Sequence, residues 1–165
     1  MKFAVGSDHT GYGLKEMLKS RLRRMNLEVV DCGTFNSQSC DYPDYAVPVA
    51  LAVARHEANQ GILICASGIG MSITANKIPG IRAALCLDAT AARLSRSIYD
   101  ANVLCLPSML VGESFVVRIL EVWLQTDFIT QKYKSVVQKI SQWEECQAKS
   151  KNSTKAVDRS ALKAV

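Results

Sequence analysis

The sequence has no apolar run close to the roughly 20 residues that a membrane-spanning helix needs, and its first residues lack the layout of a signal peptide. Both absences argue against a membrane or secreted protein, so we expect a cytoplasmic one. Histidine is scarce: the chain has two, His9 and His56, and its six cysteines include no C-x-x-C pair. Because structural zinc sites need closely spaced cysteine and histidine ligands, we expect no bound metal.

Two catalytic patterns are also missing. There is no Gly-x-Ser-x-Gly turn and no distant histidine suited to activating a serine, which argues against acyl transfer. A dinucleotide-binding fingerprint is incomplete, because Gly68 and Gly70 require a third glycine where Ile73 stands. Asp88 could supply the acidic residue of that fingerprint, so dinucleotide binding stays as a minor alternative. The main interpretation expects no cofactor.

Charge is unevenly distributed along the 165 residues. Residues 1–128 hold 12 basic and 12 acidic side chains, whereas residues 129–165 hold 8 basic and 3 acidic ones, which accounts for the net charge of +5. A basic end attracts phosphates or nucleic acid, but a solvated helix followed by a frayed terminus explains it more simply. We expect one domain over residues 1–147, a flexible basic tail over residues 148–165, and no nucleic-acid partner.

Short apolar runs alternate with segments of helical spacing along the chain. This alternation predicts parallel strands joined by right-handed helical crossovers, and strands that are apolar throughout predict a sheet covered on both faces. We therefore expect a doubly wound, mainly parallel five-stranded α/β sheet of Rossmann-like class. The expected strands are 2–6, 27–30, 61–65, 81–87 and 102–106, and the expected helices are 14–25, 45–56, 71–76, 89–97, 112–125 and 130–147. Asp44 is the expected N-cap of the second helix.

The segment from Gly61 to Lys77 carries the most chemistry. An apolar run ends at Cys65, and Gly68 and Gly70 then turn the chain into a helix. A thiol at that position lies beside backbone N–H groups that favour its thiolate and that can hold a negatively charged oxygen. Proton abstraction beside a carbonyl needs a base next to such donors, so the sequence predicts enolisation, for example aldose–ketose isomerisation.

Polar residues also follow other strands at this edge of the sheet, where doubly wound folds bind ligands. Asp8 and His9 come directly after the first strand and can contact hydroxyls or a phosphate, and Ser67 adds a hydroxyl to the cysteine loop. A plainer interpretation is that Asp8 caps a helix and that His9 is an ordinary surface residue. Cys65 has the alternative of being a buried core thiol, as we expect for the other cysteines near strand ends. Those cysteines are Cys32, Cys86 and Cys105.

Several blocks, in order along residues 1–140, resemble the type B ribose-5-phosphate isomerases, a family that includes galactose-6-phosphate isomerase subunits. The blocks are Gly6-Ser-Asp8-His9-Thr-Gly11, Asp41-Tyr42-Pro43, Cys65-Ala-Ser67-Gly68-Ile69-Gly70-Met-Ser-Ile, Ala75-Asn76-Lys77, Gly80-Ile-Arg82-Ala and Asn102-Val. The resemblance implies a doubly wound fold and the interconversion of ribose 5-phosphate and ribulose 5-phosphate without metal or organic cofactor. It also implies a homodimer with active sites at the subunit interface, and it leaves a tetramer open.

The resemblance further implies a role for each matching residue. Cys65 would be the base that moves a proton between C1 and C2 through an enediolate. The loop that follows would hold the developing charge and the substrate, and its residues are Ala66, Ser67, Gly68, Ile69 and Gly70. The other implied contacts are Asp8 and His9 with the sugar phosphate, and Asp41 and Tyr42 near the ring end of the substrate.

Other positions depart from the pattern of that family. The histidine that opens the furanose ring and the asparagine after it fall on Ile98 and Tyr99, and a phosphate-binding arginine falls on Met109. Two arginines of the last helix fall on Lys132 and Val136, and a histidine beside them falls on Tyr133. We expect Tyr99, Asp41 or water to assist ring opening, and Lys132 to keep a positive charge near the substrate. The residues that would perform the enolisation are present, whereas most of those that would open the ring and bind the phosphate are replaced.

Three interpretations follow from this mixture. The first is a working isomerase of ribose 5-phosphate, and the second is an isomerase of a different sugar or sugar phosphate that carries less charge. The third is a non-catalytic relative, which would act as a sugar-phosphate sensor or as one subunit of a mixed dimer. The first is the main interpretation, because the residues that would perform the proton transfer are present.

Overall fold

A computed structural model of the chain describes the backbone of residues 1–161 and the side chains of residues 1–129 and 131–150. The chain divides into two compact units, which are residues 1–129 and the segment from Thr130 onward. In the first unit the strands are β1 (Lys2–Ser7), β2 (Glu28–Asp31), β3 (Gln60–Cys65), β4 (Ala83–Leu85) and β5 (Val103–Pro107). Its helices are the 3-10 turn η1 (His9–Gly11), α1 (Tyr12–Arg24), α2 (Pro43–Ala54), α3 (Ile69–Ala75), α4 (Ala89–Ser97) and α5 (Glu113–Gln125). The second unit contains α6 (Thr130–Ala161).

The five strands form one sheet with the order β2-β1-β3-β5-β4, and every neighbouring pair is parallel. The central strands β3 and β5 are buried along their whole length, because they are apolar on both faces. The chain moves outward from β1 to β2 and then returns to β3 on the other side of β1. This arrangement confirms the predicted doubly wound, Rossmann-like class and makes all the strand pairs parallel.

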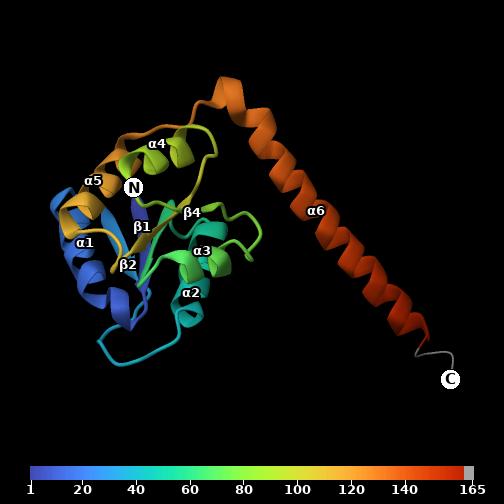
Figure 1. The fold of residues 1–165 in the computed structure, drawn as a ribbon. Coiled ribbons are helices and arrows are strands. Elements are labelled where there is room, and N and C mark those ends of the chain that lie inside the picture. The colour runs from blue at the N-terminus through green and yellow to red at the C-terminus, as the bar shows by residue number, and fades with distance from the viewer. Residues whose placement is uncertain (162–165) are drawn as a thin grey trace. The chain divides into compact units, whose positions relative to one another are not determined.

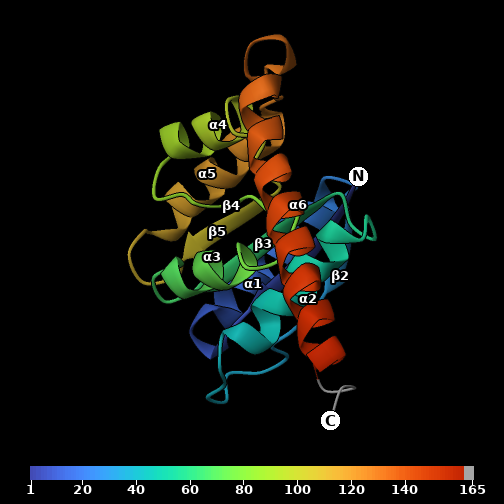
Figure 2. The ribbon, with the colours of Figure 1, turned by 90° about the vertical axis from the view of Figure 1, so that its right-hand side faces the viewer.

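Helices cover both faces of this sheet (Figures 1 and 2). On one face, α1, α4 and α5 pack on side chains such as Ile62 and Leu104, and Trp123 of α5 is fully buried there. On the other face, α2 and α3 pack on side chains such as Leu63 and Val103. Successive residues of one strand therefore enter opposite layers, which fixes the register of each strand in the sheet.

Three predicted elements differ from the structure. Helix α2 begins at Pro43, so Asp44 lies in its first turn and the N-cap prediction was wrong; the fixed φ of proline suits the first helical position. Strand β4 is shorter than the predicted 81–87, since the N–H of Arg82 donates to Oδ1 of Asn102, 2.8 Å away, rather than to a neighbouring strand. Helix α6 continues to Ala161 instead of ending at 147.

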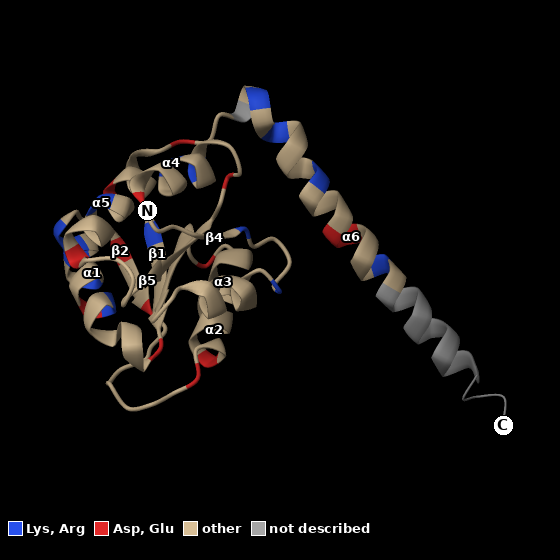
Figure 3. Cartoon of the chain, viewed as in Figure 1, with Lys and Arg blue, Asp and Glu red and all other residues tan. Residues whose placement is uncertain are grey.

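Helix α6 carries more basic than acidic residues along its described stretch (Figure 3). The predicted boundary between a domain and a tail, at 147/148, falls inside this helix, whereas the compact units divide between Ile129 and Thr130. The predicted tail over residues 148–165 stays a prediction, and its last four residues lie outside the described part of the chain. Across residues 1–161, none of the helices has the length and apolarity to cross a membrane.

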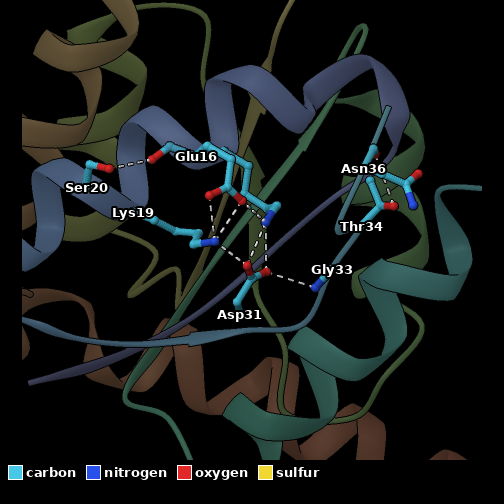
Figure 4. Close-up of polar contacts among 8 residues, drawn as sticks. Glu16, Lys19, Ser20, Asp31, Gly33, Thr34 and Asn36 are labelled. Atoms are coloured by element: carbon cyan, nitrogen blue, oxygen red, sulfur yellow. Dashed lines mark hydrogen bonds and ion pairs between the residues drawn. The ribbon is translucent and has the colours of Figure 1, made fainter. Parts of the chain in front are cut away.

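A cluster of charged side chains joins α1 to the end of β2 (Figure 4). Lys15, whose side chain is fully buried, donates to both carboxylate oxygens of Asp31 at 2.8 Å, and Lys19 donates to Asp31 and Glu16. Burial works to raise the pKa of Asp31, but hydrogen bonds from Lys15 and Lys19 outweigh it, so that pKa lies below its ordinary value. Asp31 also accepts the N–H of Gly33 at 2.9 Å, which anchors the start of the loop that follows β2.

The pKa values of Glu16 and Lys19 in this cluster also shift in the directions that favour the charged forms. Hydrogen bonds from Lys15 and Lys19 lower the pKa of Glu16. Burial works to lower the pKa of Lys19, but its hydrogen bonds to Asp31 and Glu16 raise it overall. Asp31, Glu16 and Lys19 therefore stay charged at neutral pH and hold one another in place.

Candidate active site

The order in which strands are added to the sheet reverses between β1 and β3, and open α/β sheets bind ligands at such a switch point, outside the carboxyl ends of the strands. Ser7 at the end of β1 pairs with Ile64 in β3, so Asp8 and Cys65 lie at the same level of the sheet edge. The N–H of Asp8 donates to the carbonyl oxygen of Ile64 at 3.2 Å. The structure thus brings together the two polar loops that the sequence predicted to meet.

Cys65 is the last residue of β3 and is 4% exposed. Its Sγ accepts a hydrogen bond from the N–H of Gly68 at 3.1 Å, so the sulfur is turned toward the glycine loop. Gly68 has a φ of +74°, a conformation that side-chain-bearing residues rarely adopt. A Cβ added there would lie 2.5 Å from the Leu85 side chain. Glycine at position 68 is therefore what allows this N–H group to reach the sulfur.

The loop after Cys65 supplies backbone donors. The N–H of Ile69 donates to the Ser67 hydroxyl at 3.3 Å, so two of the predicted anion-hole amides already have side-chain partners. The N–H groups of Gly70 and Met71 donate to no acceptor in the part of the chain that the structure describes, as is usual in a first helical turn. Because α3 has only 7 residues, these local groups matter more than a long helix dipole.

Of the remaining cysteines near strand ends, Cys86 and Cys105 are buried core thiols, as the sequence predicted, whereas Cys32 is only partly buried. Burial raises the pKa of Cys105, which is completely buried in β5, well above its ordinary value. Burial also raises the pKa of Cys86 to about 11 and shifts that of Cys32 in the same direction. A thiol that stays protonated is a poor base. Cys65 is also buried, in the core layer under α2 and α3, but its Sγ accepts a backbone N–H in a loop at the ligand edge.

Asp8 caps the 3-10 turn η1, which is the plainer of the two interpretations of its sequence position. Its Oδ1 accepts the N–H of Thr10 at 2.9 Å, the Thr10 hydroxyl at 2.6 Å and the N–H of Gly11 at 3.1 Å. A Cβ added at Gly11 would lie 2.8 Å from the carbonyl oxygen of Ile64, so η1 packs directly on the end of β3. The cap uses Oδ1 and leaves Oδ2 of the carboxylate for a ligand.

The loop between β2 and α2 reaches the same edge of the sheet (Figure 1). Nδ1 of His9 lies 3.2 Å from both the N and the O atoms of Cys40, so the backbone of this loop holds the imidazole. The ring of Tyr42 lies against Gly70, where an added Cβ would be 2.8 Å from two ring atoms. The exposed side chain of Tyr42 therefore flanks the first turn of α3, and its neighbour Asp41 is exposed in the same loop.

Sequence reasoning missed two residues that shape this site. The N–H and the hydroxyl of Ser108 both donate to the carbonyl oxygen of Cys65, at 2.9 and 3.3 Å, and the N–H of Met109 donates to that of Ala66 at 3.1 Å. Ser108 directly follows β5, and that position could have revealed it. Cys40, which holds His9, gave no signal in the sequence.

The structure does not bring Tyr99 to Cys65 within one chain. The carbonyl oxygen of Tyr99 accepts from Nε of Arg82 at 3.1 Å, before the start of β4, so Tyr99 lies toward the amino ends of the strands. Lys132 belongs to α6, which is described by itself, and its Nζ lies 5.2 Å from the centre of the Tyr133 ring. Their contacts with a substrate stay predictions.

Fold and site together define a doubly wound α/β enzyme with a thiol and unpaired amides at its ligand edge. Among the residues described, no three histidine, cysteine or acidic side chains gather in a way that could hold a metal ion. A family model described as Ribose/Galactose Isomerase matches residues 3–140. The chain belongs to this family and is a sugar-phosphate isomerase, which is the class predicted from its sequence.

Two relatives illustrate the similarity in sequence. Ribose-5-phosphate isomerase B of Escherichia coli (strain K12) is 43% identical over 140 residues, which cover 85% of this chain and 94% of that protein. Ribose-5-P isomerase B of Listeria innocua is 44% identical over 128 residues, which cover 78% of this chain and 86% of that protein.

Solved structures show the same fold. Ribose-5-phosphate isomerase B of Clostridium thermocellum matches with a TM-score of 0.87 and 43% identity, covering 89% of this chain and 99% of that one. Ribose-5-phosphate isomerase B of Mycoplasma genitalium with bound ribulose-5-phosphate matches with a TM-score of 0.84 and 36% identity, covering 87% of this chain and 96% of that one.

Proposed function

We propose that this chain interconverts ribose 5-phosphate and ribulose 5-phosphate, with Cys65 as the base. The observation that carries the proposal is the hydrogen bond of 3.1 Å from the N–H of Gly68 to Sγ of Cys65, at the switch point of the sheet. Relatives named ribose-5-phosphate isomerase B support the choice of substrate. The Mycoplasma genitalium relative, whose structure contains ribulose-5-phosphate, supports it as well.

The proposed reaction starts from the open-chain aldose. The thiolate of Cys65 takes the proton from C2, the electron pair forms the C1–C2 double bond, and the carbonyl oxygen O1 becomes an enediolate oxygen. The loop amides and the Ser67 hydroxyl stabilise that oxygen, and Ser67 relays the proton between O2 and O1. The thiol then returns its proton to C1, which gives the ketose. His9 and Asp8 hold the substrate, and Asp41 and Tyr42 lie near its ring end.

We also propose that two copies of the chain form a homodimer that shares these sites. Ile69 and Ile73, on one face of α3, are 50% and 56% exposed, and Met109 and Leu110, after β5, are 73% and 63% exposed. Exposed apolar side chains gathered beside a ligand edge are typical of an interface. A second copy would also offer a route for Tyr99 and Lys132 to reach a site. Charged sugar phosphates are confined by membranes, which suits the predicted cytoplasmic location.

The test is turnover of ribose 5-phosphate by the purified full-length chain in D₂O. We expect ribulose 5-phosphate to form and deuterium from the solvent to enter the carbon-bound positions, because the thiol exchanges the abstracted proton with the solvent while the enediolate persists. Ketose that forms without any deuterium would contradict the thiol mechanism. The same reaction in tritiated water, followed from short reaction times and low conversion onward, should then also leave the ketose without label. No conversion and no exchange would contradict the proposed function itself.

A second candidate, an isomerase of a less charged sugar, is favoured by one observation. Met109 is 73% exposed, and its backbone is bonded to Ala66 of the cysteine loop. An apolar side chain there gives a phosphate no charged partner. A panel of free and phosphorylated aldoses separates the two candidates. An isomerase of a less charged sugar should have a higher kcat/KM for a free sugar than for ribose 5-phosphate.

The substitution Met109→Arg provides a direct check of that contrast. If ribose 5-phosphate is the substrate, we expect kcat/KM to rise by about tenfold or more, because a charge-assisted hydrogen bond to an anion contributes about 1.5–3 kcal/mol. The variant Met109→Gln, which is polar but uncharged, is the matched control and should change kcat/KM by less than about threefold. An equal effect of both variants would show that charge at this position is irrelevant to the substrate.

A further inference from the structure

A cavity of about 330 Å³ lies at the edge of the sheet opposite to Cys65. The amino ends of β3 and β5 form its floor, and the ends of α2 and α4 and the segment before β4 complete its walls. This volume lies at the lower end of the range of small-ligand pockets. The side chains that matter for the argument are His56, Gln60, Arg82, Arg96, Asp100 and Asn102.

The cavity carries an excess of positive charge. Arg82 donates through Nη2 to Oδ2 of Asp100 at 2.8 Å, and Arg96 donates through Nη1 to Oδ1 at 3.2 Å. Two guanidinium groups thus share a single carboxylate, and the exposed His56 adds a further charge at the rim when it is protonated. The arginine side chains are 21% and 13% exposed, so solvent screens them only in part.

The side-chain acceptors that line the cavity are already occupied. Both carboxylate oxygens of Asp100 accept from arginine, Oδ1 of Asn102 accepts the N–H of Arg82 at 2.8 Å, and Oε1 of Gln60 accepts from the indole of Trp123 at 2.9 Å. By contrast, Nε of Arg96 is buried and has no hydrogen-bond partner. Arg82 also donates through Nε to the carbonyl oxygens of Tyr99 and Asp100, and Arg96 donates through Nη1 to that of Ala101. Of the five N–H donors of each guanidinium, those on Nη1 of Arg82 and Nη2 of Arg96 remain without a partner among the residues described.

We propose that this cavity binds a small oxyanion, a phosphate- or carboxylate-bearing metabolite held by Arg82 and Arg96. An anion would balance the excess charge and accept from the guanidinium N–H groups that remain, and the planar fork of arginine suits both kinds of oxyanion. The site lies at the other end of the strands from Cys65 of the same chain, so its occupant is not the substrate held at that thiol. The proposal does not depend on which sugar the enzyme isomerises.

Trp123 provides a reporter inside this region. The guanidinium of Arg96 lies 5.5 Å from the centre of the Trp123 ring, and the indole N–H is bonded to Gln60. The chain has two tryptophans, so the substitution Trp143→Phe leaves Trp123 as the only tryptophan, whose emission is observed by selective excitation of tryptophan over tyrosine. We expect inorganic phosphate, citrate or both to change its emission with saturation, whereas chloride at the same ionic strength does not. A response to one of the two anions alone identifies the oxyanion class.

Two variants of equal size at His56 give the decisive comparison. The φ of His56 is +59°, a conformation that Asn and Asp tolerate better than most residues, so His56→Asn and His56→Asp should both fold. They differ in one charge at the rim, and we expect about fivefold weaker anion binding in His56→Asp. In addition, Arg96→Lys should weaken binding by about tenfold, because it removes the fork. Equal midpoints in the two His56 variants, or no saturable change with either anion, would overturn the proposal.

Discussion

Replacing Cys65 by alanine should lower kcat for ribose 5-phosphate by about 10³-fold, which is within the usual contribution of a general base. The variant Cys65→Ser should lose nearly as much, because a hydroxyl is a far weaker acid than a thiol and does not provide an anionic base at neutral pH. KM should change little, since the substrate is held by the amides and side chains around the thiol. Steady-state kinetics with circular dichroism as a check on folding make the measurement.

The matched control for this prediction is Cys86→Ala. Cys86 is also a buried thiol near a strand end, but burial raises its pKa to about 11 and its Sγ lies near Ser95 rather than the ligand loop. We expect its kcat to stay within about twofold of the unmodified enzyme, because the proposed base is untouched. A Cys65→Ala enzyme that retained a comparable kcat would remove the thiol from the mechanism and leave the fold assignment intact.

Replacing Asp31 by asparagine should lower the free energy of unfolding by about 3 kcal/mol. Removal of one partner from a buried ion pair usually costs about 3–5 kcal/mol, and the low end applies because Glu16 still accepts from Lys15 and Lys19. The control Glu16→Gln should cost less than about 1 kcal/mol, because that side chain is 42% exposed. Urea unfolding at neutral pH measures both. A cost for Asp31→Asn no larger than that for Glu16→Gln would contradict a buried network.

The loss of stability in Asp31→Asn should depend on pH. The pKa of Asp31 is lower in the folded chain than its ordinary value of 3.8, so its contribution is present above that pH and is lost as the pH falls through the folded value. The difference between the original chain and Asp31→Asn should therefore shrink in acid. At the alkaline end, the raised pKa of Lys19 means that the contribution of Lys19 to stability disappears only above pH 10.5.

A second variant, Asp31→Asn with Lys15→Met, should recover part of the stability lost in Asp31→Asn, because no buried charge is left unpaired.

Much of the fold could be predicted because its signals are local. The apolar runs that became β1, β3 and β5 are bounded by polar or glycine-rich segments, and each was placed within about two residues, the usual error of such boundaries. The failures were local conflicts. Asp44 was expected to cap a helix that starts at Tyr45, but the helix already begins at Pro43. The N–H of Arg82 donates to a side chain rather than to a neighbouring strand, which shortens β4.

The sequence by itself determined the parallel sheet, the ligand edge and the loop that starts at Cys65, because strand alternation and glycine position fix where the polar residues emerge. Tertiary structure alone decided what each of these residues contacts. It directed the N–H of Gly68 to the sulfur of Cys65, placed Tyr42 against Gly70, and put Tyr99 at the amino ends of the strands, away from Cys65 of the same chain. The reason is physical: the contacts of Tyr42 and Tyr99 join residues distant in sequence, and even the short-range contact from Gly68 to Cys65 depends on how α3 packs on the sheet.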